Sequence, residues 1–156
     1  MGFDSITTRS ANENDLETLY RFEQGIISTE RPFDETLKEG QIHYYDLKAM
    51  ITAPDVELAV AVDGDKVVGS GYARITTSKV YLKHPQHVYL GFMYVEPDYR
   101  GKGINQKIIN HLKRWAITKG ITEMRLDVYH HNLPAIKAYE KYGFSQLLTE
   151  MRMGID

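Results

Sequence analysis

The first third of the chain contains one short strand-like run, followed by apolar residues that recur at the spacing of a helix. Residues 6–9 have the composition of a strand, and the apolar residues that follow Asn12, which can cap a helix, recur at helical spacing. We expect a loop over residues 25–33, since the proline near its end disfavours helix at the residue before it. A second helix is predicted over residues 34–51, and Gly40 weakens it enough that it could divide in two.

The pattern then changes to that of strands. Residues 56–62 form a continuous apolar run, and residues 66–76 and 88–95 are rich in β-branched and aromatic side chains. The Asp-Gly-Asp segment at 63–65 separates the first two runs and predicts a tight hairpin turn, because Asp-Gly tolerates positive φ. A helix is expected over residues 102–119, where apolar side chains fall on one stripe and a glycine follows.

The last part of the chain is predicted to hold a strand, a short helix and a final strand. Residues 124–129 form the strand, Asn132 caps a helix that runs to Tyr142, and residues 144–153 form the closing strand. The order of elements is therefore β-α-α-β-β-β-α-β-α-β. This order indicates an α/β (α+β) fold in a single domain over residues 1–156.

Composition narrows the classes of function. The chain has 156 residues and no cysteine, which excludes disulfides, zinc–thiolate sites and thiol nucleophiles and is consistent with a reducing compartment. A net charge of −2 and a pI of about 6.3 give no reason to expect nucleic acid or an anionic membrane as a partner. No apolar run approaches the ~20 residues that cross a bilayer, and the first residues do not resemble a signal peptide. We expect a cytoplasmic protein without a bound metal.

The most informative segment is a glycine turn, Arg100-Gly101-Lys102-Gly103-Ile104-Asn105, between strand 88–95 and the next helix. Such a turn directs backbone N–H groups at one point, at the positive end of a helix dipole, and this suits a phosphate. The segment is not a P-loop, because glycine follows Gly101-Lys102 where Ser or Thr is required, and Gln106 replaces the third glycine of a dinucleotide fingerprint. Taken alone, the turn could equally be a solvated connection.

A wider pattern surrounds this turn. It consists of Val95-x-Pro97-x-Tyr99-Arg100-Gly101-Lys102-Gly103-Ile104 and, some thirty residues later, Asn132-x-x-Ala135-x-x-x-Tyr139-x-x-x-Gly143-Phe144. The two motifs resemble those of the GNAT superfamily of acyl-CoA-dependent N-acyltransferases, except that Asn105 stands where Gly or Ala is usual. The resemblance implies a mixed, mostly antiparallel central sheet flanked by helices. It also implies an enzyme that transfers an acetyl group from acetyl-CoA to a primary amine by direct attack.

The resemblance also assigns the cosubstrate site. Backbone groups of Met93, Tyr94 and Val95 should pair with the pantetheine arm as if it were an added strand. The pyrophosphate should lie on the turn that comprises Arg100, Gly101, Lys102, Gly103, Ile104, Asn105 and Gln106. Asn132 should contact the cosubstrate near its thiol end, and its side chain can cap the following helix at the same time.

Two residues are candidates for proton transfer. Tyr139 occupies the family's usual general-acid position, and a phenol with a pKa near ~10 can donate to the departing thiolate at neutral pH. Packing in the core is its alternative role. Asp127 lies where some relatives carry a catalytic Glu, so it is the candidate base, acting through a water, with an ion pair or solvent exposure as the alternative. Other relatives place an acid at Tyr89, and its absence argues against the protein-lysine acetyltransferase mechanism.

The acceptor site is expected on the two N-terminal helices and their loops. A mixed aromatic and charged set lies there: Glu30, Arg31, Phe33, Asp34, Tyr44 and Tyr45. The guanidinium of Arg31 would suit a carboxylate on the acceptor, whereas Glu30 or Asp34 would suit an amine. The alternative is that these residues form ordinary loop and helix surface. We expect a small-molecule or peptide amine as acceptor and allow for a homodimer. The alternative function is a non-catalytic acyl-CoA-binding regulatory module of the same fold.

Overall fold

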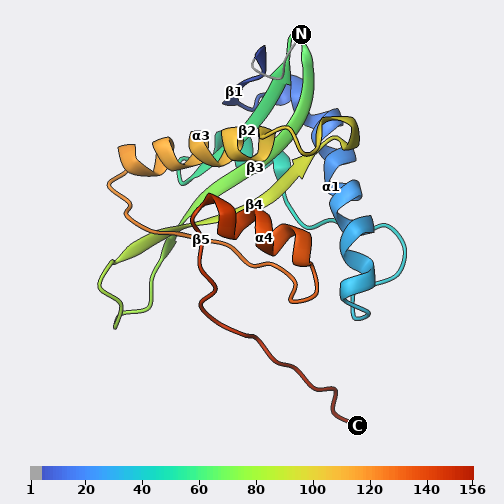
Figure 1. Cartoon of the computed structure of the whole chain (residues 1–156), viewed down its shortest axis with the longest axis vertical. Coiled ribbons are helices and arrows are strands. Elements are labelled where there is room, and N and C mark those ends of the chain that lie inside the picture. Colours follow the sequence, from blue (N-terminus) through green and yellow to red (C-terminus); the bar gives the residue numbers. More distant parts are fainter. Residues whose placement is uncertain (1–4) are drawn as a thin grey trace.

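The computed structural model describes residues 5–156, which form a mixed sheet with helices on both faces (Figure 1). Within these residues the sheet has five strands in the order β1-β2-β3-β4-β5. Neighbours are antiparallel up to β4, and β4 and β5 are parallel. The strands are β1 (Thr7–Ser10), β2 (Val56–Asp63), β3 (Lys66–Thr77), β4 (Gln86–Val95) and β5 (Met124–Arg125). The helices are α1 (Leu16–Glu30), α2 (Leu47–Thr52), α3 (Ile104–Thr118) and α4 (Leu133–Tyr142).

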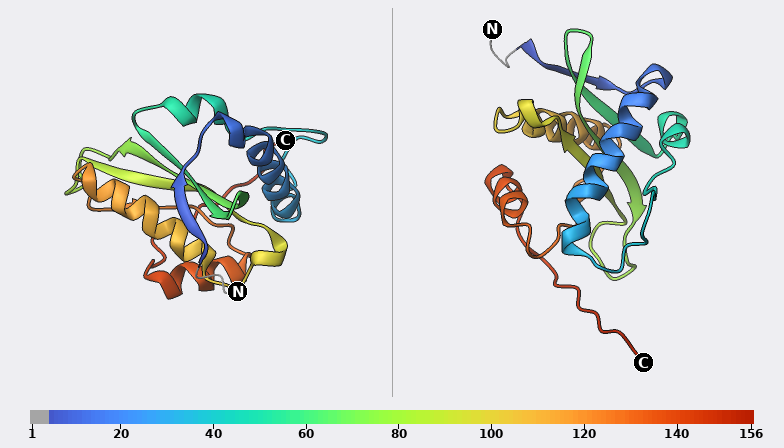
Figure 2. Two further views of the ribbon diagram at one scale, coloured as in Figure 1. Left: turned by 90° about the horizontal axis from the view of Figure 1, so that it is seen from above. Right: turned by 90° about the vertical axis from the view of Figure 1, so that its right-hand side faces the viewer.

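Each face of the sheet has its own core. Helices α1 and α2 cover one face and α3 and α4 the other, as the two views of Figure 2 show. On the first face Leu19 and Phe22 of α1 are fully buried against strand residues such as Val60. On the second face Ile108 and Leu112 of α3 are fully buried against the opposite side of the same strands. The expected fold class is confirmed. Within residues 5–156 we find no helix that is long and apolar enough to cross a bilayer.

The predicted loop over residues 25–33 is wrong, because α1 continues to Glu30 and a 3-10 turn, Arg31–Phe33, follows directly. Burial explains the difference. Ile27 is buried in the core, and Gly25 leaves room for the ring of Tyr94, since a Cβ at Gly25 would lie 2.8 Å from Tyr94 Cε1. Packing therefore outweighs the weak helix propensity of glycine.

The predicted helix over residues 34–51 is also wrong in its first two thirds. Only α2 is helical, and it begins after Asp46, whose Oδ1 accepts a hydrogen bond from the amide of Ala49 at 3.2 Å. Asp34 caps a turn instead, because its Oδ1 accepts from the amide of Thr36 at 2.9 Å. The segment between Asp34 and Asp46 is an irregular loop, which we call the acceptor-side loop.

The end of the chain differs most from the sequence prediction. The strand expected at 124–129 is reduced to β5, and no strand forms over 144–153 in the described structure. Residues 145–156, which we call the C-terminal arm, instead leave the body as an extended segment (Figure 1). A strand needs a partner for its backbone groups, and the arm has none in the sheet of this chain.

Candidate active site

A bulge in β4 shapes the centre of the site. The pairing of β3 and β4 shifts register after Ser70, and Phe92 has a φ of +57°, the one positive value outside glycine in residues 5–156. Ser70 Oγ donates a hydrogen bond to the carbonyl of Phe92 at 2.9 Å and is itself buried. A Cβ at Gly91 would lie 2.6 Å from the ring of Tyr72, so a glycine is required beside the bulge.

Beyond the bulge, β4 and β5 separate. The two strands pair only at Val88↔Met124 and Tyr89↔Arg125, while β4 runs on to Val95. In the described part of the chain, Met93, Tyr94 and Val95 therefore have no strand on the β5 side of their backbone. An extended ligand can add to such an edge as a further strand. These are the residues predicted to pair with pantetheine.

The glycine turn lies at the end of this separated strand. Gly101 and Gly103 have φ values of +74° and +82°, and Gly103 is the N-cap of α3. The first turn of the helix is closed by the amide of Lys107 bonding to Gly103 O at 3.2 Å, so the amides of residues 104–106 lack an intrahelical acceptor. A Cβ at either glycine would meet nothing within 4 Å, which means that the space over the turn is open. Open space, free amides and a helix N-terminus fit a pyrophosphate.

Arg100 and Ile104 hold the turn in place. Arg100 Nε donates to Val95 O at 2.7 Å, and its guanidinium lies 5.4 Å from the centre of the Tyr94 ring. Ile104 is buried in the core, so only its backbone faces the turn. Asn105, the departure from the usual motif, is half-buried, and Gln106 is exposed. Lys102 is exposed on the turn itself.

Tyr139 lies on α4, whose N-cap is Asn132. Asn132 Oδ1 accepts from the amide of Ala135 at 3.4 Å, which confirms the capping role. Tyr139 is half-buried, and its ring packs edge-on against Phe144 with centres 5.8 Å apart. Burial raises the pKa of the Tyr139 phenol to about 12, and the negative charge of Glu30 adds to the effect. The hydroxyl is therefore a proton donor throughout the neutral range.

Asp127 lies on the segment after β5, and its side chain contacts that of Tyr89 on β4. The Tyr89 hydroxyl donates to Asp127 Oδ2 at 3.2 Å, and Asp127 is exposed. Burial raises the pKa of Tyr89, and the carboxylate of Asp127 raises it further, so the phenol stays protonated. The two residues join β4 to the segment after β5 at the point where the strands separate.

The acceptor-side loop brings carboxylates and aromatic rings toward this region. Burial raises the pKa of Glu30, and the neighbouring charge of Asp34 raises it too. Tyr129, which follows Asp127, donates to Asp34 Oδ2 at 3.3 Å and stacks on Phe33 with ring centres 5.8 Å apart. Four of the predicted acceptor residues, Glu30, Phe33, Asp34 and Tyr44, are thus gathered beside Tyr129.

Arg31 and Tyr45 have structural contacts in the same region. Arg31 donates to the carbonyl of Lys38 at 2.8 Å and to that of Gly40, and so closes the acceptor-side loop on itself. Tyr45 packs against Phe92 with ring centres 5.1 Å apart and borders the core beneath the bulge.

Comparison with known proteins decides the family. The model of the acetyltransferase (GNAT) family matches residues 16–144 of the chain. The chain belongs to this family. Thialysine N-epsilon-acetyltransferase of Bos taurus is 30% identical over 93% of the chain and 86% of its own length. Streptothricin acetyltransferase of Streptomyces lavendulae is 33% identical over 56% of the chain and 43% of that protein.

Solved structures agree on the GNAT fold. The BH1408 protein of Bacillus halodurans, solved as a tetramutant, matches with a TM-score of 0.83 at 18% identity over 95% of the chain and 99% of its own. The aminoglycoside acetyltransferase AAC(6')-Iy, solved with a bisubstrate analogue, matches with a TM-score of 0.74 at 20% identity over 97% and 98%. The predicted family and fold are confirmed. The chain is an acyl-CoA-dependent acetyltransferase at the level of its family, with acetyl-CoA as cosubstrate.

Sequence reasoning missed the residue that positions the acceptor-side loop of this GNAT protein. Glu23 on α1 is fully buried, and its Oε2 accepts from the amides of Tyr44 and Tyr45 at 2.9 Å each. Its Oε1 lies 2.8 Å from His43 Nδ1. The sequence did contain a signal for this role, since Glu23 falls on the apolar stripe of α1. A carboxylate at such a position is buried, and a buried carboxylate needs hydrogen-bond donors around it.

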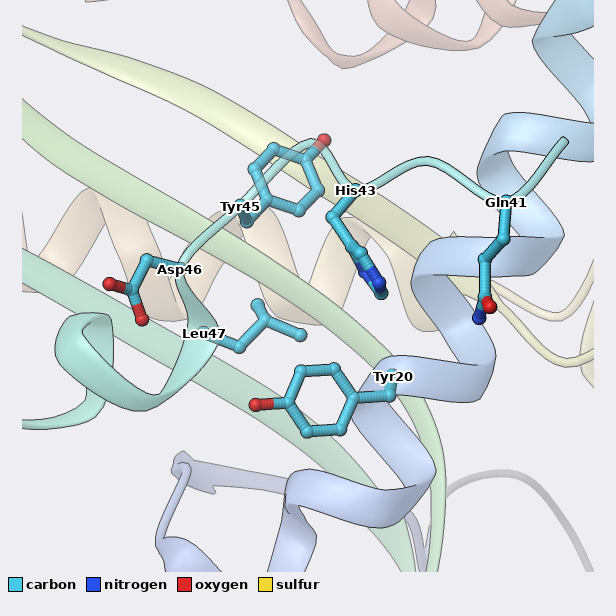
Figure 3. A pocket seen from close by; sticks show the side chains of 6 residues that line it. All are labelled: Tyr20, Gln41, His43, Tyr45, Asp46 and Leu47. Atoms are coloured by element: carbon cyan, nitrogen blue, oxygen red, sulfur yellow. The ribbon is translucent and has the colours of Figure 1, made fainter. Parts of the chain in front are cut away.

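A pocket lies at the end of the acceptor-side loop. Its lining comprises Tyr20, Gln41, His43, Tyr45, Asp46 and Leu47, between α1 and the start of α2 (Figure 3). It includes neither the glycine turn nor Tyr139, so we assign no catalytic role to it.

Proposed function

We propose that this protein is an N-acetyltransferase that transfers the acetyl group of acetyl-CoA to the primary amine of a small cationic acceptor. The observation that carries the proposal is the separation of β4 from β5, which leads directly to the open glycine turn. We infer that an extended thioester lies along the separated strand with its pyrophosphate on the turn, and that Tyr139 and Asp127 act at the thioester end.

Named groups of the chain have defined parts in this proposal. The backbone of Met93, Tyr94 and Val95 aligns the extended arm, and the amides of the turn hold the pyrophosphate. When bound, acetyl-CoA supplies an activated acyl group as a thioester. Tyr139 holds a proton for the departing sulfur, since its raised pKa keeps the hydroxyl protonated. Asp127 accepts the proton that the amine loses, through a water, because its carboxylate is exposed and held by Tyr89.

The acceptor end is suited to a positive charge. Glu30 is a half-buried carboxylate beside tyrosine hydroxyls, and its raised pKa records the cost of keeping its charge away from water. A ligand ammonium placed there would offset that cost, and the rings of Phe33 and Tyr129 would receive its carbon chain. Relatives are named as a thialysine N-epsilon-acetyltransferase, a streptothricin acetyltransferase and an aminoglycoside N(6')-acetyltransferase, and the nitrogen named in the first and the last supports an amine as acceptor.

A screen for CoA release from acetyl-CoA tests the proposal. The panel pairs each primary diamine or aminoglycoside with an analogue of equal length in which one ammonium is replaced by a hydroxyl. We expect turnover with the amines and a higher KM for the analogues with one charge fewer. Binding of CoA without turnover on any amine would instead support the regulatory module, while the lack of any CoA binding would overturn both functions.

A further inference from the structure

The segment between β4 and the glycine turn is a single turn of 3-10 helix, η4 (Pro97–Tyr99). Its hydrogen bonds are local, from the amide of Tyr99 to Glu96 O at 2.9 Å and from that of Arg100 to Pro97 O at 3.3 Å. A 3-10 turn of this length has poor hydrogen-bond geometry and little stability of its own. The position of the glycine turn therefore depends on contacts that this segment makes with the rest of the fold.

The side chain of Tyr99 makes such a contact. Its hydroxyl donates a hydrogen bond to Asp63 Oδ2 at 2.7 Å, at the end of β2 and thirty-six residues earlier in the chain. A hydrogen bond from a hydroxyl to a carboxylate is stronger than one between neutral groups. This bond also raises the pKa of the Tyr99 phenol, which therefore remains a donor at neutral pH. The ring of Tyr99 packs against the core that α3 covers.

Asp63 belongs to a firmly held part of the sheet. It pairs with Lys66 where the β2–β3 hairpin turns, and Lys66 Nζ lies 5.3 Å from the centre of the Tyr99 ring. The phenol is thus held by two cross-strand partners, one through its hydroxyl and one through the face of its ring. Val68 of the same hairpin is fully buried, and its carbonyl accepts a hydrogen bond from the amide of Glu96 at 2.8 Å. Backbone and side-chain bonds therefore both join the hairpin to the start of η4.

Two further contacts of this segment are weaker or more local. Arg21 of α1 forms an ion pair with Glu96 at 3.1 Å, but the side chain of Arg21 is 59% exposed, and exposed ion pairs contribute little to stability. Arg100 donates to Val95 O, which closes the segment on the end of β4 without reaching another element. Compared with these two, the bond of the phenol to the hairpin carboxylate is both charge-assisted and long-range, so it restrains the glycine turn more strongly.

We propose that Tyr99 and Asp63 are positioning residues that hold the glycine turn in the geometry that binds the pyrophosphate of CoA. The inference rests on the proposed function, because that function assigns the pyrophosphate to the turn. The backbone amides of residues 104–106 have to converge on the same phosphate group, and hydrogen bonds weaken steeply outside a narrow range of distance and angle. A small displacement of the turn would therefore weaken several of these bonds at once.

Titration calorimetry with CoA tests the proposal. Tyr99→Phe keeps the ring and removes only the hydroxyl, and we expect it to raise the Kd for CoA about tenfold, the lower end of the scale for one lost hydrogen bond to a charged group. Asp63→Ala should have the same effect, and the double variant should bind no more weakly than either single variant, because all three lose one and the same bond.

Two further variants serve as controls. Asp63→Asn should retain part of the affinity, since its amide oxygen still accepts a hydrogen bond from the phenol. Asp65→Ala changes an exposed carboxylate in the same hairpin turn and should bind CoA as the unmodified chain does. An unchanged Kd in Tyr99→Phe or in Asp63→Ala would overturn the proposal, as would an equal loss of affinity in Asp65→Ala.

Hydrogen exchange without ligand separates positioning from a general loss of stability. The amides of Tyr99, Arg100 and Lys107 are hydrogen-bonded on either side of the glycines, and they should exchange faster in Tyr99→Phe, while residues 86–95 of β4 exchange as before. Unchanged exchange at these three amides, or faster exchange along β4 as well, would overturn the proposal. An unmodified chain that binds no CoA would overturn the proposed function together with this inference, whereas normal CoA binding with the same Kd in both variants would overturn this inference alone.

Discussion

Glycine is favoured at positions 101 and 103 by the backbone conformation of the turn, and not by a lack of space for a side chain. Both have φ in the left-handed region, and a Cβ at either would point into open space over the turn. A side chain there would occupy the space that a phosphate needs and would also strain the turn. The two effects can be separated, because Gly120 at the end of α3 has a similar φ of +73° and equally open surroundings.

Gly103→Val should therefore lose CoA binding by at least tenfold, while Gly120→Val should keep it. Both variants carry a similar backbone strain of roughly 1–2 kcal/mol and should unfold at similar, slightly lower temperatures. Titration calorimetry with CoA measures the difference. Equal CoA affinities of the two folded variants would show that the pyrophosphate does not bind at this turn.

The hydroxyl of Tyr139 is expected to act in the chemistry rather than in folding. Tyr139→Phe should lower kcat by roughly 10²-fold or more and leave CoA affinity unchanged. Because the folded pKa is raised to about 12, the phenol loses its proton only near that pH, so it should add no alkaline limb to the rate profile below pH 10. Tyr142→Phe on the same helix is the control, since the Tyr142 hydroxyl donates to Asn110 Oδ1 of α3 at 2.6 Å. An unchanged kcat in Tyr139→Phe would show that the hydroxyl is not needed for catalysis and that Tyr139 has a packing role.

Among the elements, the acceptor-side loop depends on α1 for its shape. Glu23 accepts two amides of the loop, and Gln24 Nε2 donates to the carbonyl of Ile42 at 2.9 Å. The loop has no regular secondary structure, so these side chains take the place of a backbone ladder. Its conformation is thus set by the helix against which it lies.

Glu23→Gln should loosen this loop, because a neutral amide oxygen accepts more weakly than the charged Oε2 that now holds the amides of Tyr44 and Tyr45. We expect a stability loss of about 1.5–3 kcal/mol, the usual range for hydrogen bonds to a charged group, and a higher KM for the acceptor with little change in CoA affinity. Hydrogen exchange at residues 42–46 reports the loosening directly. Glu17→Gln, at an exposed position of the same helix, is the matched control and should resemble the unmodified chain.

Elements with local signals were predicted well, and those set by distant contacts were not. The Asp63-Gly64-Asp65 turn defined the β2–β3 hairpin within one residue, and the stripe of α3 and the cap of α4 were found for the same reason. The continuation of α1 through Gly25 depends on the ring of Tyr94, sixty-nine residues later, which no local pattern contains. The glycine turn could be predicted from the sequence, because Gly101 and Gly103 stand between a predicted strand and a predicted helix. The bulge at Phe92, which opens the site, was not predicted, because the one signal for it, Gly91 inside the strand pattern, favours a bulge without determining it.

For the molecule as a whole, CoA should act as a stabilising ligand. A ligand that binds only the native state at a hundredfold excess over its Kd contributes ~2.7 kcal/mol. For a domain of 156 residues this corresponds to a rise in Tm of roughly 5–10 °C. Scanning fluorimetry with increasing CoA measures it, and Gly103→Val should show a much smaller rise. A flat melting temperature at millimolar CoA would contradict the cosubstrate assignment.

The bulge at Phe92 makes the length of β4 as important as its chemistry. Because strand side chains alternate, each residue after the bulge faces the side opposite to the one it would face in an uninterrupted strand. Deleting one residue between Gly91 and Val95 would turn Tyr94 away from Gly25 and from Phe22, whose ring centre lies 4.6 Å from its own. It would also let β4 follow β5 without separating. Homologous or designed sequences should therefore accept many substitutions in this stretch but no change in its number of residues, whereas the loop between β3 and β4 can vary in length.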